Sequence, residues 1–269
     1  MTNSPIKSRI PQVRFRRGCP SWDASTFQLI HERDRPLWDS FVKRQYPSLH
    51  KLEEDCCQKI RRGIRAGVAA LYGGRRRFLR ERAHEFQVVW DTVNDQWMFC
   101  LSEVLETDWN SLPDIFTAYV WFSPICPRNL ADHSFAVAYF LPPLEIVRVC
   151  AHETAHFLYC MKLQHIDPRI TEEEFNFPHR QWLLSEILVP VILNDPRAAQ
   201  VIGESPINSY VCSKALSMRL LEAYRCRLRE GLSFEGFYQL ITAIELRSED
   251  IATKFQSILH QSPKEKRHV

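Results

Sequence analysis

The sequence has no long uninterrupted run of apolar residues. No segment offers the roughly 18 consecutive apolar residues that a membrane-spanning helix needs, and no apolar signal segment stands at the N-terminus. The chain has 269 residues, of which 45% are hydrophobic and 25% charged. This composition predicts a globular protein with one sizeable core, or with a core and a helical annex.

Cysteine is present without the spacing of a disulfide framework. The chain has nine cysteines, an odd number, and no C-x-x-C pair. Cys150 and Cys160 fall inside a strongly apolar segment, where buried thiols are common. This usage suits a reducing compartment, and we therefore expect a cytoplasmic protein. No cysteine stands out as a catalytic nucleophile.

Acidic residues are absent from residues 1–22, which carry five basic residues and three prolines. We expect residues 1–22 to be a flexible basic tail; an organelle-targeting segment or an arm for an anionic partner are the alternatives. A second basic cluster begins at Arg75. The net charge of the whole chain is only +3, which argues against a dedicated nucleic-acid surface. The basic residues of the first segment are Lys7, Arg9, Arg14, Arg16 and Arg17.

The most informative feature present is an H-E-x-x-H motif that runs from His152 to His156. Two histidines four residues apart lie about 40° apart around a helix and roughly 6 Å along it, so both can bind one metal ion. Glu153 stands beside that ion, where it can accept a proton from a metal-bound water. The surrounding segment 144–164 reads as a buried helix, because it is apolar on nearly every face. The alternative is a surface helix with two ordinary histidines.

A third protein ligand is needed to leave one position for water at a tetrahedral zinc ion. Glu186 is the strongest candidate, because it is the only acidic residue in the apolar helix predicted over 182–193. Its alternative role is a buried salt bridge to an arginine, and His179 is the alternative ligand. Thr171 and Glu174 form a capping box that gives the acidic run 172–174 a structural role. His165 and Asp167 lie in the turn after the metal helix and are expected to point away.

The motif, followed by a glutamate on a second helix, resembles the gluzincin clan of zinc metallopeptidases. The order of a strand over 134–140, the metal helix and the glutamate helix is similar to the minimal members of that clan. The resemblance implies that the strand is the sheet edge that aligns a peptide substrate by backbone pairing, with Ala136, Ala138 and Phe140 facing it. It covers roughly residues 87–196, and only H-E-x-x-H is specific. The gap of 29 residues between the second histidine and Glu186 is longer than in the thermolysin-like members.

The fold that we predict is α+β, with a small mixed sheet whose edge strand packs on the metal helix. The sheet is expected to include strands at 116–122 and 134–140, with helical parts before and after it. The predicted segments are a basic tail over 1–22, a helical part over 23–86, a zinc-peptidase core over 87–196, a helical part over 197–262 and a tail over 263–269.

These residues predict a hydrolase that uses Zn²⁺ as its cofactor. His152, His156 and Glu186 would hold the ion, and Glu153 would activate its water to attack a peptide or protein substrate. A further donor would stabilise the oxyanion, and the candidates are Tyr210, Tyr224 and Tyr238. The alternatives are an inactive, metal-stabilised binding module and a regulatory protease that acts on a DNA-binding partner. The sequence indicates no oligomeric state.

Overall fold

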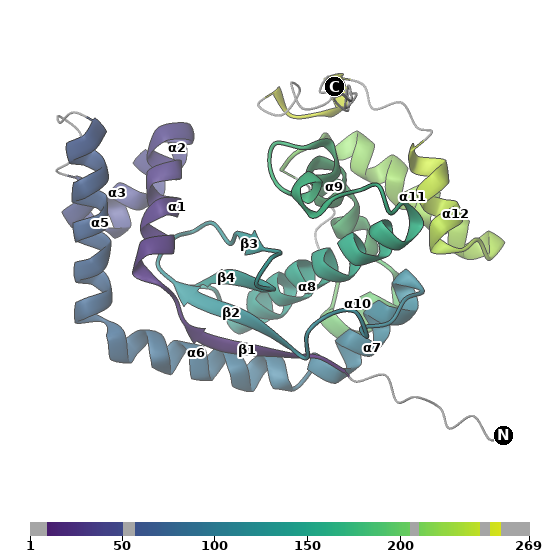
Figure 1. Ribbon diagram of the computed structural model, residues 1–269, viewed down its shortest axis with the longest axis horizontal. Helices are drawn as coiled ribbons and strands as arrows, with labels where there is room; N and C mark the ends of the chain where they lie inside the picture. Colours follow the sequence, from purple (N-terminus) through teal and green to yellow (C-terminus); the bar gives the residue numbers. More distant parts are fainter. Residues whose placement is uncertain (1–9, 51–56, 205–209, 243–247, 254–269) are drawn as a thin grey trace, which may run out of the picture. The chain divides into compact units, whose positions relative to one another are not determined.

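The computed structural model describes residues 10–50, 57–204, 210–242 and 248–253. The chain divides into two compact units, each built from separate stretches of sequence. The first unit comprises residues 1–12, 93–115 and 147–269, and the second comprises residues 13–92 and 116–146. This division differs from the consecutive segments that the sequence predicts, because the units alternate along the chain. Figure 1 shows the elements of both units.

The sheet has four strands in the order β1-β2-β4-β3. Strands β2 (Ile115–Trp121) and β4 (Ser134–Ala138) pair in parallel, with Thr117 opposite Ser134 and Trp121 opposite Ala138. The two-residue strand β3 (Arg128–Asn129) pairs antiparallel with β4. The α+β class and the small mixed sheet are therefore confirmed.

Strand β1 (Gln12–Arg17) occupies part of the segment for which the sequence predicted a flexible tail. The amide groups of Gln12 and Gly18 donate to the carbonyl oxygens of Asp114 and Val120, both at 2.8 Å, so β1 runs parallel to β2. Val13 is fully buried while Arg14 and Arg16 are exposed. The prediction of a flexible tail is therefore wrong for Gln12–Arg17. Successive side chains of a strand point to opposite faces, so β1 can bury Val13 and expose its arginines to solvent.

Strand β4 is not the edge that the resemblance implied, because it lies between β2 and β3. The amide of Ala136 donates to the carbonyl oxygen of Pro127 at 2.9 Å, on the side where a substrate was expected to pair. Ala136 and Ala138 are buried, and Phe140 lies in the turn that follows the strand. The turn at residues 130–133 brings the chain back against β4, a return that the sequence alone did not reveal.

The second unit also contains the helical part that the sequence predicted over 23–86. Helix α5 ends at Gly74, and Arg75 separates it from α6, which extends beyond the predicted part to Asp91. The elements are α1 (Pro20–Arg33), α2 (Arg35–Leu37), a π-helical turn η1 (Trp38–Val42), α3 (Lys43–Gln45), α4 (Pro47–His50), α5 (Cys57–Gly74) and α6 (Arg76–Asp91).

The first unit is helical in its described part, and it contains both helices of the predicted metal site. Gly231 ends α11 in the left-handed region at φ 66°. The helical part predicted over 197–262 lies partly outside the described residues. The elements are α7 (Asn94–Leu105), α8 (Pro143–Ile166, from Val147 on in this unit), η2 (Glu172–Phe175), α9 (Arg180–Ile192), α10 (Pro196–Ile202), α11 (Lys214–Glu230), α12 (Phe234–Thr242) and η3 (Ser248–Asp250).

Two further predictions concern membranes and thiols. Among the described residues, no helix combines the length and the apolar character that crossing a bilayer requires. The seven cysteines whose side chains are described form no disulfide.

Candidate metal centre

Helix α8 positions the two histidines of the motif. It begins at Pro143, where a proline costs no hydrogen bond, and Glu145 lies in its first turn. His152 and His156 are one turn apart on the same side of this helix, as the spacing predicts. The surrounding positions of α8 are buried, including Ala151 and Ala155, so the helix is fixed along most of its length.

Helix α9 brings Glu186 to the same place. Every residue from Leu183 to Ile192 is buried, and Glu186 is the only charged side chain among them. Pro190 lies inside the helix and cannot donate a hydrogen bond to the carbonyl group of Glu186. Helix α9 is buried because its residues are apolar, and the carboxylate of Glu186 is therefore buried with it.

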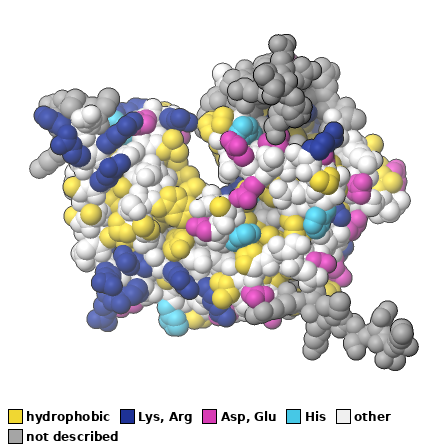
Figure 2. All heavy atoms as spheres, in the orientation of Figure 1, with side chains coloured by type: hydrophobic (Ala, Val, Ile, Leu, Met, Phe, Trp, Pro, Cys, Tyr) yellow, Lys and Arg dark blue, Asp and Glu magenta, His cyan; other side chains and the backbone are white. Residues whose placement is uncertain are grey.

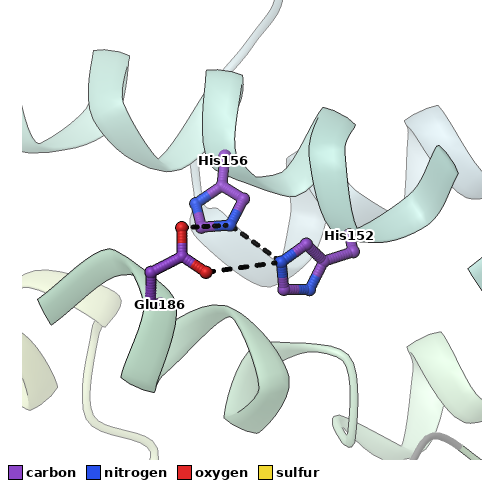
Figure 3. Close-up of side chains that lie close together, drawn as sticks. All are labelled: His152, His156 and Glu186. Atoms are coloured by element: carbon purple, nitrogen blue, oxygen red, sulfur yellow. Dashed lines mark hydrogen bonds and ion pairs between the residues drawn. The ribbon is translucent and has the colours of Figure 1, made fainter. Parts of the chain in front are cut away.

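The three side chains converge in a small cluster, drawn in Figure 3. The two imidazole Nε2 atoms are 2.9 Å apart. Glu186 Oε1 lies 3.7 Å from His156 Nε2, and Glu186 Oε2 lies 3.9 Å from His152 Nε2. One ligand atom from each residue lies within 4.8 Å of the other two.

These separations suit one shared cation. Two ligand atoms that each lie about 2.1 Å from a tetrahedral ion are about 3.4 Å apart, and the observed distances fall on both sides of that value. The donor set of two imidazoles and one carboxylate is one that zinc uses in catalytic sites. The cluster can therefore hold a metal ion, and its chemistry fits zinc.

Burial at the cluster is uneven. The side chain of His156 is fully buried and that of Glu186 is 5% exposed, whereas the side chain of His152 is 26% exposed. Glu153, directly after His152 on α8, is 5% exposed. Solvent therefore reaches the cluster at His152, and the glutamate expected to move protons lies beside that histidine in the sequence.

The motif is also anchored from the far side of α8. Trp97 of α7 is fully buried, and its indole Nε1 donates to Thr154 Oγ1 at 2.8 Å. The Thr154 hydroxyl donates in turn to the carbonyl oxygen of Cys150 at 2.6 Å. No local signal in the sequence predicts this contact, because the two residues are 57 positions apart in the chain.

The other candidate ligands are placed elsewhere. Among the described residues, the possible metal cluster consists of the two motif histidines and Glu186 alone, and His179 precedes α9 as its N-cap residue. The carboxylate of Glu174 accepts from the amide of Thr171 at 2.7 Å, as a capping box requires. Asp167 binds the guanidinium of Arg169, which lowers the pKa of that carboxyl.

The candidate oxyanion donors differ in their surroundings. The hydroxyl of Tyr224 donates to Asp195 Oδ2 at 2.8 Å, and burial raises the pKa of Tyr224. Tyr238 is 7% exposed, and burial raises its pKa. Tyr210 is 60% exposed. Tyr224 therefore has a structural partner in Asp195.

In comparisons with protein-family models, curated proteins and solved structures, nothing matches this chain. The motif and the geometry of the cluster therefore carry the functional argument.

Proposed function

We propose that this protein is a zinc-dependent peptidase of gluzincin type. The observation that carries the proposal is the convergence of His152, His156 and Glu186 from two helices, with an H-E-x-x-H glutamate beside them. An imidazole pair with one carboxylate leaves a fourth position of a tetrahedral ion for a reactant. The absence of disulfides among the described cysteines supports a reducing compartment such as the cytoplasm.

When bound at this cluster, zinc would supply Lewis acidity that makes a water molecule reactive near neutral pH. The two histidines and Glu186 would hold the ion. Glu153 would accept the proton of the attacking water and then deliver it to the nitrogen that leaves the cleaved peptide. Its place directly after His152 on α8 supports this role, because the motif spacing sets this carboxylate beside the proposed ion.

The decisive experiment replaces Glu153 by Gln. We expect the Glu153→Gln variant to bind zinc as the parent does and to lose about 100- to 10,000-fold in the rate of peptide hydrolysis, because the amide cannot accept the proton. Hydrolysis is measured with a randomised library of fluorogenic peptides, and zinc by elemental analysis. Glu145→Gln, in the first turn of the same helix, is the matched control and should keep parental activity.

A variant that cleaves as fast as the parent would contradict the role of Glu153. A zinc-loaded parent that cleaves nothing in the library would contradict the peptidase itself. The burial of His156 and Glu186 favours one second candidate, a metal-stabilised binding module without catalysis. That candidate requires a zinc ion with four protein ligands, which X-ray absorption spectroscopy on the zinc-loaded protein distinguishes from three ligands and a water.

A further inference from the structure

Helix α8 is closed to solvent over most of its length in the first unit. Among its residues 147–161, only Arg148, Val149 and His152 are not buried. His152 is the member of the metal cluster that solvent reaches, with a side chain that is 26% exposed. A molecule that approaches the cluster along α8 therefore passes over Arg148 and Val149.

These three positions share one face of the helix. At about 100° per residue, Arg148 lies about 40° and Val149 about 60° from His152 around the helix axis. Arg148 also lies about 6 Å from His152 along the axis, because it is four residues earlier. An extended peptide advances about 3.3 Å per residue, so a chain that lies along α8 brings a residue about two positions from the cleaved bond to Arg148.

The guanidinium of Arg148 is held by the chain that follows α10. Its Nη2 donates to the carbonyl oxygen of Glu204 at 2.9 Å. A guanidinium has five N–H groups in a planar fork, so it can bind a backbone carbonyl and a carboxylate at the same time. The acidic residue spaced to meet Arg148 on the same helix, Glu145, lies on the side away from His152. The arginine is thus positioned before a substrate arrives, which reduces the entropy lost on binding.

The first unit as a whole is negatively charged. It carries 17 Lys and Arg against 20 Asp and Glu. Figure 2 shows Asp and Glu side chains spread over the part of the surface where Figure 1 places α11 and α12. The net charge of the unit does not attract acidic peptides at long range, so a preference for them requires a local contact such as one with Arg148.

We propose that Arg148 binds a carboxylate of the peptide substrate. This carboxylate is either an acidic side chain about two residues from the cleaved bond or the C-terminal carboxylate of the substrate, because the fork of N–H groups binds both in the same way. Val149 would contact the part of the peptide between this carboxylate and the metal centre. The inference rests on the proposed function, since it assigns the substrate class of the same site.

The test uses the zinc-loaded full chain and matched pairs of fluorogenic peptides. One member of each pair has Glu and the other Gln near the cleaved bond, and each peptide is made with a free and with an amidated C-terminus. We expect the parent to prefer one source of carboxylate about tenfold or more in kcat/KM over its neutral match. In Arg148→Gln this ratio should fall to about one. If an acidic side chain is the source, Arg148→Glu should instead favour peptides with Lys at that position, which a purely structural role of Arg148 would not produce.

Arg225→Gln is the matched control, because Arg225 is exposed on α11 and its loss should leave the parental ratio unchanged. Parental melting temperatures show that each variant is folded. Binding of labelled peptides to zinc-loaded Glu153→Gln, with and without Arg148→Gln, is measured by anisotropy and does not depend on cleavage.

These two measurements separate this inference from the peptidase itself. Carboxylate-dependent binding that Arg148→Gln abolishes, without cleavage by the parent, would contradict the peptidase and support the role of Arg148. Equal binding of acidic and neutral peptides would overturn the role of Arg148. So would a preference for carboxylates that Arg148→Gln retains.

Discussion

Glu186 supplies the one carboxylate among the three converging side chains, and it comes from a different helix than the imidazoles. A buried carboxylate is costly unless a cation or several donors stabilise it. The two histidine Nε2 atoms lie 3.7 and 3.9 Å from its carboxylate oxygens, beyond the length of a short hydrogen bond. A metal ion between them would explain both the burial and the spacing.

The ligand set can be tested one residue at a time. We expect His152→Ala and Glu186→Ala to lower zinc affinity about 100-fold or more, because each removes a direct ligand. His179→Ala should retain zinc, since His179 lies outside the cluster. Competition with a chromogenic chelator measures the affinities. If His179→Ala lost zinc and Glu186→Ala retained it, the third ligand would be His179 and not Glu186.

At the scale of elements, both helices of the site were predictable and parts of the sheet were not. The helix around the motif was expected over 144–164 and extends over Pro143–Ile166, since prolines mark its start and its sides are apolar. The strand over 134–140 was found, but its position inside the sheet depends on β3, which has only two residues. Strand β1 was missed although Val13 and Phe15 alternate with arginines, because the prolines and the lack of acidic residues in this segment favoured a tail.

The contact of α7 with the back of the metal helix gives a prediction at this scale. We expect Trp97→Phe to lower the free energy of unfolding by about 1–3 kcal/mol, through the lost hydrogen bond and the space left behind. It should also weaken zinc binding, because Thr154 lies within the motif itself. Chemical denaturation and chelator competition measure the two effects.

Trp109→Phe is the matched control for this prediction. The indole of Trp109 donates to the carbonyl oxygen of Met98 in α7 at 3.0 Å, and not to a residue of the motif. This variant should lose similar stability and keep parental zinc affinity. Equal zinc affinities in the two variants would show that the hydrogen bond from Trp97 to Thr154 does not position the metal-binding histidines.

At the scale of the whole molecule, stability depends on a carboxylic acid buried in the second unit. Asp23 of α1 is fully buried. Its Oδ2 accepts from the hydroxyl of Tyr72 and from the amide of Phe122, both at 2.9 Å. Its Oδ1 accepts from the amide of Ser123 at 3.0 Å. One side chain therefore joins α1, α5 and the end of β2.

Burial raises the pKa of Asp23 to about 7 from 3.8, against the opposing effect of these hydrogen bonds. Between these two values the folded state holds a proton that the unfolded state has lost. The free energy of unfolding should therefore fall as the pH rises from about 4 to 7 and level off above. The contribution amounts to about 3 kcal/mol between pH 5 and pH 8.

Asp23→Asn should remove this dependence on pH, although it lowers stability overall because an amide nitrogen cannot accept the donors that the second oxygen accepts. Urea denaturation of the metal-free parent and variant at several pH values measures it, because the difference between the two cancels the contribution of the histidines. A slope that the substitution leaves unchanged would contradict the titration of Asp23.

The alternation of the two units along the chain has a consequence for synthesis on the ribosome. All residues of the second unit precede residue 147, while Glu186 is added 40 positions after that unit is complete. At ordinary rates of translation this interval lasts on the order of seconds, longer than most small domains need to fold. We therefore expect the second unit to fold on the nascent chain before Glu186, the third residue of the metal cluster, has been synthesised.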